Sequence, residues 1–260
     1  LAGNRHRRSA TLAAAEDSLE LLDLARAFDP DAREGRAWSA YVRITRGCNK
    51  FCTYCVVPNT RGAEVHRPPD HIVEECRKLA EAGVVEITLL GQTANHYRYT
   101  HGVSTDASGR EAPQVGPGLS AFRGPEAERL AQSGGGERDA IDASGRRVTT
   151  FARLLARIHD EVPQLRRLRF VTSYPRDFGP DVLDVIAARP RIAPYIHAPA
   201  QSGSDRILKL MNRGYQVADY RAFVESIFER MPQATLAGDF IVGFPTETDE
   251  DFEASLALIR

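Results

Sequence analysis

Short apolar segments alternate with helical segments from residue 40 onward, and this alternation restricts the fold more than any other feature of the chain. The β-leaning segment VVEITLLG at 84–91 follows a stretch at 68–83 in which apolar residues recur at helical spacing. Four further strands are predicted, at 40–44, 168–173, 193–200 and 234–244. Strands that are connected through helices form a parallel sheet, either open or curled into a barrel, so the sequence predicts an α/β fold.

Residues that favour helix ends support the predicted helices. Asp70 suits the N-cap of the helix within 68–83, and Gly83 suits the position just after its end. Ser204 is the predicted N-cap of a helix that stops before Gly214, and Thr248 begins a capping-box pattern at the start of the last helix. Further helices are predicted at 150–160, 179–188 and 219–230.

Two segments do not follow the alternation. Residues 1–37 are predicted to be a helical linker at the end of a preceding N-terminal domain, which leaves 38–260 as the main domain. Between 98 and 148, Gly, Ser and charged residues are mixed without a sustained period, and nine of the 20 glycines of the chain fall between 101 and 150. This composition offers little apolar surface to bury, so the sequence predicts a flexible insertion there.

Composition and charge narrow the class of protein. A chain of 260 residues that is 42% hydrophobic can build the core of one or two domains. A formal net charge of -1 provides no overall basic field for nucleic acid or membrane, although a local basic patch remains open. No apolar run approaches the roughly 18 residues of a membrane span, and the start of the chain has no apolar signal-peptide core. We therefore expect a cytoplasmic protein with no membrane contact. A monomer is also expected.

Three of the four cysteines lie within eight positions, in the stretch RGCNKFCTYC. Cys48, Cys52 and Cys55 have the spacing C-x3-C-x2-C, which indicates a metal or redox site in a reducing compartment rather than a disulfide framework. Thiolates suit iron–sulfur clusters and zinc. A [4Fe–4S] cube bound by three cysteines leaves its fourth iron open to a small molecule. A zinc site would need a fourth ligand, either His66 from a loop or Cys76 from an apolar helix face.

The cysteine loop after the first strand resembles that of the radical S-adenosylmethionine (SAM) enzymes, in which an aromatic residue such as Tyr54 typically precedes the last cysteine. Five longer blocks follow in this order: GCNKFCTYCVVPNTRGAEVHRP (47–68), GVVEITLLGQTANHY (83–97), LRFVTSYPRDF (168–178), QSGSDRILKLMNRGY (201–215) and DFIVGFPTETDEDF (239–252). Together these blocks resemble the tRNA methylthiotransferases, of the tRNA-2-methylthio-N6-dimethylallyladenosine synthase type. Within the first block, the stretch VVPNTRG resembles the branch that modifies adenosine beside the anticodon more than the branch that modifies a ribosomal protein.

The resemblance implies a partial (β/α) barrel of the radical SAM type, in which SAM lies across the C-terminal ends of the strands. Cys48, Cys52 and Cys55 are then the ligands of a [4Fe–4S] cluster. The implied SAM-binding residues follow the ends of the later strands and are Gln92, Ser173, Gln201, Ser202, Asp239, Gly243 and Phe244. Each has an ordinary alternative, such as a strand-end turn at Gln92, a loop cap at Ser173 or a partner for a buried arginine at Asp239. No catalytic residue is assigned.

Other polar residues near these motifs remain open between two roles. Arg213 either reaches the site or only favours the C-terminal end of its helix. Arg61 and Arg67, which flank the cysteine loop, either contact RNA phosphates or are ordinary solvated side chains. His197 is expected to be a satisfied core histidine rather than a ligand. The stretch APA before Gln201 departs from the Leu-Pro-(Leu/Val) usual in the family, which thins an apolar wall of the implied site.

The resemblance also implies an activity and its partners. A reduced cluster splits SAM into methionine and a 5′-deoxyadenosyl radical, which abstracts hydrogen from C2 of an adenosine in the tRNA anticodon stem-loop; sulfur and a methyl group then enter. The family uses a second [4Fe–4S] cluster in an N-terminal domain, a C-terminal RNA-binding domain and an electron donor such as flavodoxin or ferredoxin. We therefore expect this chain to be C-terminally truncated. Two alternatives remain: a methylthiotransferase acting on a ribosomal protein side chain, and a non-catalytic metal-stabilised binding module.

Overall fold

The computed structural model describes residues 38–105, 111–113, 139–171 and 173–260. The linker predicted at 1–37 lies outside the described residues. The main sheet has three parallel strands, with β4 (Glu86–Leu90) between β1 (Ser39–Arg43) and β10 (Arg167–Phe170). Val42, Ile87 and Leu89 are fully buried in these strands, so apolar side chains fix the register of the parallel pairs.

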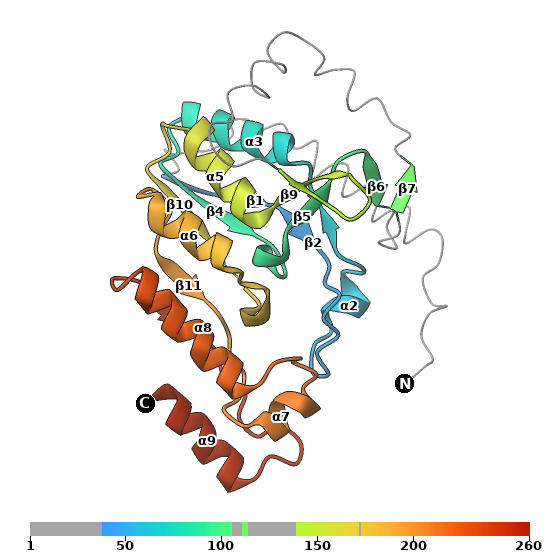
Figure 1. The fold of residues 1–260 in the computed structure, drawn as a ribbon, viewed down its shortest axis with the longest axis vertical. Coiled ribbons are helices and arrows are strands. Elements are labelled where there is room, and N and C mark those ends of the chain that lie inside the picture. Colours follow the sequence, from blue (N-terminus) through green and yellow to red (C-terminus); the bar gives the residue numbers. More distant parts are fainter. Residues whose placement is uncertain (1–37, 106–110, 114–138, 172) are drawn as a thin grey trace.

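The sheet continues through a loosely paired segment into two more parallel strands. The N–H of Leu168 in β10 donates to the Arg191 carbonyl at 2.8 Å, and the N–H of Ala193 donates to the Leu168 carbonyl at 2.9 Å. That segment leads into β11 (Tyr195–His197), which pairs in parallel with β12 (Thr235–Ala237). The strands therefore follow one another in chain order across a curved wall (Figure 1), and the predicted α/β fold is confirmed.

The helices connect these strands in the predicted order. Figure 1 shows α3 (Pro69–Glu81) at the top of the molecule and α9 (Asp249–Ile259) at the bottom. None of the helices in the described part of the chain is long and apolar enough to cross a membrane. The longer helices are α3 (Pro69–Glu81), α5 (Phe151–Glu161), α6 (Pro180–Ala188), α7 (Asp205–Leu210), α8 (Val217–Arg230) and α9 (Asp249–Ile259). The short ones are α2 (Val57–Thr60), η1 (Ala94–His96) and η3 (Pro175–Asp177).

Two of the three predicted N-caps are confirmed. The Ser204 and Thr248 hydroxyls accept hydrogen bonds from the N–H groups of Ile207 and Asp251, at the starts of α7 and α9. The prediction for Asp70 is wrong, because α3 begins at Pro69, two residues earlier than a cap at Asp70 requires, and Pro68 is its N-cap. Proline is readily accepted at the first helical position, since the N–H that it lacks has no helical partner there, and Asp70 then lies in the first turn.

The segment at 98–148 is more regular at its ends than the sequence predicts. A three-stranded antiparallel sheet consists of β5 (Arg98–Thr100), β9 (Arg147–Thr150) and β8 (Ala140–Ile141), and β6 (Val103–Thr105) pairs with β7 (Glu111–Pro113). Val148 and Thr149 are fully buried. The prediction of an irregular segment from 98 to 148 is therefore wrong at both ends, because β9 leads directly into α5 and its apolar side chain joins the folded domain.

The core lies in two parts. The larger part fills the space between the main sheet and helices α3, α5 and α6, with Phe151, Leu155 and Phe170 among its fully buried side chains. A smaller cluster contains Cys52 together with Tyr174, Leu208, Tyr215 and Tyr220. Through Cys52, this second cluster packs against the cysteine loop. The position of the loop therefore depends on residues from the distant second half of the chain.

Candidate iron–sulfur and SAM site

The cysteine loop follows β2 (Thr45–Arg46) and returns through β3 (Val65–His66), which pairs with β2 in the antiparallel sense. Gly47 begins the loop with φ +71°, and a Cβ atom there would lie 2.0 Å from the Ala63 carbonyl oxygen. Only glycine fits such a close approach of two backbone segments. The N–H of Cys48 donates to the Gly62 carbonyl at 3.2 Å, so the first cysteine is fixed where the loop closes.

The middle of the loop is fastened to the end of α7. The Thr53 N–H donates to the Met211 carbonyl at 3.1 Å, and the Thr53 hydroxyl donates to the Leu210 carbonyl at 3.0 Å. The Asn212 side-chain amide donates to the Phe51 carbonyl at 3.0 Å. These bonds hold the three cysteines at the C-terminal ends of the strands, where sites on parallel α/β sheets are found.

All four cysteines are free thiols, and their surroundings separate them as the sequence predicts. Cys48 and Cys55 are half-buried and Cys52 is buried in the loop, whereas Cys76 is fully buried in the main core on α3. The Cys48 sulfur lies 3.6 Å from the Thr93 hydroxyl, and burial raises the pKa of its thiol. Burial also raises the pKa of the Cys76 thiol, which lies among the apolar side chains of the main core, away from the loop.

The donor set of the loop fits an iron–sulfur cube better than a zinc ion. A cube offers a separate iron to each of the three cysteines and leaves one iron open, whereas a structural zinc ion usually takes four protein ligands. Cys76 does not complete such a zinc site, because it is fully buried in the main core.

Arg213 reaches the cysteine loop, which decides between its two predicted roles. Its side chain is buried, and its Nη1 donates to the Cys52 sulfur at 3.5 Å and to the Tyr54 hydroxyl at 3.4 Å. Its Nη2 donates to the Pro199 carbonyl at 3.1 Å, and the guanidinium lies 4.4 Å from the centre of the Tyr174 ring. A fixed cation beside a cysteine sulfur stabilises the thiolate that iron requires.

Ser173 and Gln92 follow the ends of neighbouring strands β10 and β4. Ser173 is buried, and its hydroxyl has no hydrogen-bond partner among the described residues. A buried hydroxyl without a partner is unusual and indicates a missing polar ligand. Gln92 is exposed at the same end of the sheet. The positions of both residues fit SAM, and their contact with it stays a prediction.

Thr93 and Asn95 belong to this end of the sheet, and the sequence did not single them out. Thr93 lies against Cys48, while Asn95 joins the loops after β4 and β10: its Nδ2 donates to the Tyr174 carbonyl at 2.8 Å and its Oδ1 accepts from the Tyr174 N–H at 2.9 Å. The sequence does contain a signal for them, because a run of polar residues directly follows the buried strand. Of that run, only Gln92 was predicted to bind SAM.

Gln201 and Ser202 lie after β11 but face different surroundings. Gln201 has φ +72°, and its backbone pairs with the segment after β12, with hydrogen bonds of 2.9 Å to Asp239 and from Ile241. The Ser202 hydroxyl is buried, accepts from the Ser204 N–H at 3.1 Å and lies 3.4 Å from the Ser255 hydroxyl of α9. These contacts give Ser202 a role in packing α9, and its contact with SAM stays untested.

The predicted strand at 234–244 ends early. Pairing with β11 stops at Ala237, so Asp239 lies after β12 rather than inside it. The Asp239 carboxylate is mostly exposed and lies 3.0 Å from His197 Nε2, so its partner is a histidine and not a buried arginine.

Gly243 and Phe244 form a turn closed by Glu247, whose carboxylate accepts from both of their N–H groups. Gly243 has φ +72°, and a Cβ atom there would meet nothing within 4 Å. The positive φ therefore accounts for glycine at this position, since no atom of the described residues would contact a Cβ atom there. The contacts of Gly243 and Phe244 with SAM stay predictions.

Arg67 has a structural role and is not an ordinary solvated side chain, while its contact with RNA stays a prediction. Its Nη1 donates to the Arg43 carbonyl at 2.7 Å and forms an ion pair with Glu75 at 2.8 Å, and its side chain is only 16% exposed. Arg61 is exposed at the end of α2 and remains available to contact RNA.

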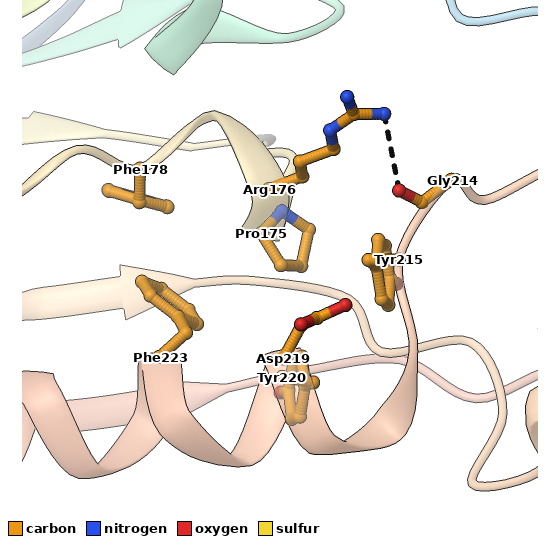
Figure 2. Close-up of a pocket in the computed structure, with 8 residues that line it drawn as sticks. All are labelled: Pro175, Arg176, Phe178, Gly214, Tyr215, Asp219, Tyr220 and Phe223. Atoms are coloured by element: carbon orange, nitrogen blue, oxygen red, sulfur yellow. Dashed lines mark hydrogen bonds between the residues drawn. The ribbon is translucent and has the colours of Figure 1, made fainter.

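Two adjoining hollows open beside the cysteine loop. One of about 360 Å³ is lined by Asn49, Lys50, Tyr174 and Arg176, among others, and Lys50 pairs with Asp177 at 2.5 Å. The other, of about 350 Å³, lies between η3 and α8. Figure 2 shows Arg176 reaching across it to the Gly214 carbonyl, 3.2 Å away, with Phe178 and Phe223 at its other end.

Proteins similar to this chain carry names that agree with an iron–sulfur and SAM site. The Radical SAM superfamily model matches residues 42–259. Three similar relatives are named tRNA-2-methylthio-N(6)-dimethylallyladenosine synthase: those of Rhodopirellula baltica (45% identical over 89% of this chain), Roseobacter denitrificans (41% over 89%) and Mycobacterium avium (40% over 89%). The chain spans 39%, 42% and 27% of their respective lengths.

Solved structures of similar fold include the radical S-adenosylmethionine methyltransferase TsrM of Kitasatospora setae, with a TM-score of 0.55 and 18% identity over 86% of this chain and 34% of that one. The cobalamin-dependent S-adenosylmethionine radical enzyme OxsB has a TM-score of 0.52 and 11% identity over 84% of this chain and 26% of that one. At these identities the likeness shows the fold alone. The sequence match across nearly all of the described domain, together with the three-cysteine loop at the strand ends, shows that the chain belongs to the radical SAM superfamily.

Proposed function

We propose that this chain is the radical SAM part of a tRNA methylthiotransferase, which adds a methylthio group to C2 of an N6-modified adenosine beside the anticodon. Its relatives at 40–45% identity are named for the synthesis of such a nucleoside. The observation that carries the proposal is the cysteine loop, whose three free thiols lie at the C-terminal ends of the sheet strands beside the hollow lined by Asn49 and Lys50.

The cofactors of the family are a [4Fe–4S] cluster and SAM. Cys48, Cys52 and Cys55 would hold the cluster, whose chemistry is to supply one electron for the cleavage of SAM. Arg213 stabilises negative charge at the Cys52 sulfur. The buried Tyr174 and Tyr215 rings flank the guanidinium and exclude water from this side of the loop.

Residues at the strand ends would bind SAM. Ser173 offers a buried hydroxyl without a protein partner, and Gln92 lies exposed after the neighbouring strand. Gln201 and Asp239 lie across from one another on the paired segments after β11 and β12. Phe244 is half-buried and offers an aromatic face for adenine.

The substrate would approach over the cysteine loop. Phe51 is 62% exposed there, and an exposed aromatic ring is a stacking partner for an unpaired base. Arg176 is exposed beside the adjoining hollow, and Arg61 is exposed at the loop's end, so positive groups are available for phosphates. These features suit the single-stranded loop of an anticodon stem-loop.

Further parts of the reaction belong to the proposal as well. They are a second [4Fe–4S] cluster in an N-terminal domain, an electron donor of the flavodoxin or ferredoxin type, and a monomeric enzyme in the cytoplasm. Support for an additional domain comes from the relatives, which are more than twice as long as the aligned region of this chain.

The test is mass spectrometry of tRNA nucleosides from cells that carry the complete gene, its deletion, and the deletion complemented with wild type, Cys52→Ala or Cys76→Ala. The 2-methylthioadenosine derivative should disappear on deletion and return with wild type and Cys76→Ala only. Unchanged tRNA nucleosides in the deletion strain would refute the proposal. A change in the mass of a ribosomal protein from the same cells would instead support the protein-modifying alternative.

A further inference from the structure

Three metal-binding side chains meet beside the cysteine loop, although the proposed function uses none of them. Glu64 and His66 come from the returning end of the loop at β3, and His96 comes from η1 after β4. One ligand atom from each of these residues lies within 4.8 Å of the other two. Two imidazoles and one carboxylate form a donor set that suits zinc, with room for a further ligand.

Two polar atoms of this cluster, one on Glu64 and one on His66, are buried without hydrogen-bond partners among the described residues. The Glu64 side chain is only 2% exposed, and its Oε2 lies 2.5 Å from His96 Nδ1. The second carboxylate oxygen, Oε1, is buried without a hydrogen-bond partner among the described residues, and so is Nδ1 of His66. A buried carboxylate with one unpaired oxygen is costly, so these atoms indicate a missing cation.

The His66 ring is held in place with one nitrogen unpaired, and the cluster is open to solvent on one side. Tyr97 packs edge-on against this ring, with 5.5 Å between ring centroids, which orients it without supplying a charge. The His96 side chain is 39% exposed and gives an ion a path to the site from solvent.

We propose that Glu64, His66 and His96 bind a divalent transition-metal ion, zinc by their chemistry, that is separate from the iron–sulfur cluster. The ion joins the returning end of the cysteine loop to the segment after β4. Glu64 is itself tied to the loop, because its N–H donates to the Asn49 side-chain oxygen at 3.2 Å, next to Cys48. The metal therefore holds the segment of Glu64 and Asn49 next to Cys48. It leaves the three loop thiols free to bind the cluster.

The test uses the full chain with its cluster loaded anaerobically, so that the loop cysteines are occupied. The protein is given one equivalent of zinc, dialysed against metal-free buffer and analysed for zinc by mass spectrometry, and its zinc K-edge X-ray absorption is recorded. We expect one zinc per chain, with only nitrogen and oxygen neighbours at about 2.0–2.2 Å. His66→Ala and His96→Ala should each weaken zinc binding at least tenfold, while His71→Ala, an exposed histidine on α3, should leave it unchanged.

Iron content and circular dichroism show whether each variant is folded and loaded. If a variant misfolds, the X-ray absorption spectrum of the wild type still distinguishes the proposed site from zinc bound to cysteines. Zinc bound to cysteines has sulfur neighbours at about 2.3 Å. A sulfur shell, a wild type that retains no zinc, or folded His66→Ala and His96→Ala variants that bind zinc as tightly as the wild type would each overturn the proposal.

Discussion

Arg213 Nη1 lies 3.5 Å from the sulfur of Cys52, although the two residues are 161 positions apart in the chain. The guanidinium is buried among Tyr174, Tyr215 and the Pro199 carbonyl, so its charge is directed at the cysteine loop rather than at solvent. A fixed positive charge at this point stabilises the more negative, reduced form of a bound cluster.

Arg213→Met should therefore make the cluster harder to reduce. We expect the reduction potential to fall on the order of 60 mV, which is a tenfold change in the equilibrium constant of a one-electron couple. Arg176→Met is the matched control, because Arg176 is an exposed arginine that bonds to Gly214 and makes no hydrogen bond or ion pair with a loop cysteine among the described residues. An electron-resonance redox titration that gives equal potentials for wild type and cluster-loaded Arg213→Met would contradict this role.

Cys48→Ala, Cys52→Ala and Cys55→Ala should each abolish cluster assembly, because each thiol holds one iron. Cys76→Ala should retain a full cluster and lose only about 1 kcal/mol of stability, since it removes a single buried sulfur from the main core. Iron and sulfide analysis after anaerobic reconstitution separates the two classes. A folded Cys76→Ala protein without iron would show that the ligands are wrongly assigned.

Gly47→Ala should disable the loop without touching a thiol. The new Cβ atom would lie 2.0 Å from the Ala63 carbonyl oxygen, so the backbone on either side of Cys48 has to separate. Gly83→Ala is the control: Gly83 also has positive φ, +93°, but a Cβ atom there meets nothing within 4 Å, so only about 1–2 kcal/mol of conformational strain is expected. Normal iron content in Gly47→Ala would show that the loop tolerates the displacement.

Asp251 should stabilise the attachment of α9 in a pH-dependent way. Hydrogen bonds from Arg206, Ser204 and Thr248 hold the pKa of its carboxyl well below the usual range. A carboxyl with a depressed pKa in the folded state contributes its full stability above its unfolded pKa of about 3.9 and loses it as pH falls below that value. Asp251→Asn should thus lower the urea midpoint at pH 7, and the difference from wild type should shrink below about pH 4. A difference that is independent of pH would argue against the ionised carboxylate.

The order of strands and helices was predictable because it depends on local patterns. Residues close together in the sequence determine the apolar periodicity of α3 and α5. The same holds for the caps at Ser204 and Thr248. Strand ends were less predictable: β12 stops at Ala237 because its pairing with β11 ends there, and such pairing depends on residues about forty positions away. The strands within 98–148 were missed for the same reason, since β5 and β9 pair across a long segment.

The candidate site divides in the same way. The three cysteines were predictable because they share one short loop, and the fourth cysteine was recognised from the apolar face of its helix. Contacts between distant segments were not predictable from the sequence. Examples are the contact of Thr93 with Cys48 and that of Asn95 with Tyr174. Ser202 shows why a local pattern is ambiguous, because a serine beside a strand end can also serve to pack a later helix, here α9.

The measurement that tests the account most directly is the effect of SAM on the reduced cluster. The chain is reconstituted anaerobically, its iron and sulfide are counted, and the electron-resonance spectrum is recorded with and without SAM. If the protein ligands of the cluster are Cys48, Cys52 and Cys55, each chain should hold four irons and four sulfides. SAM should then change the spectrum, because one iron is free to bind it. One bound zinc in place of iron, or a loaded cluster whose spectrum SAM leaves unchanged, would contradict the assignment.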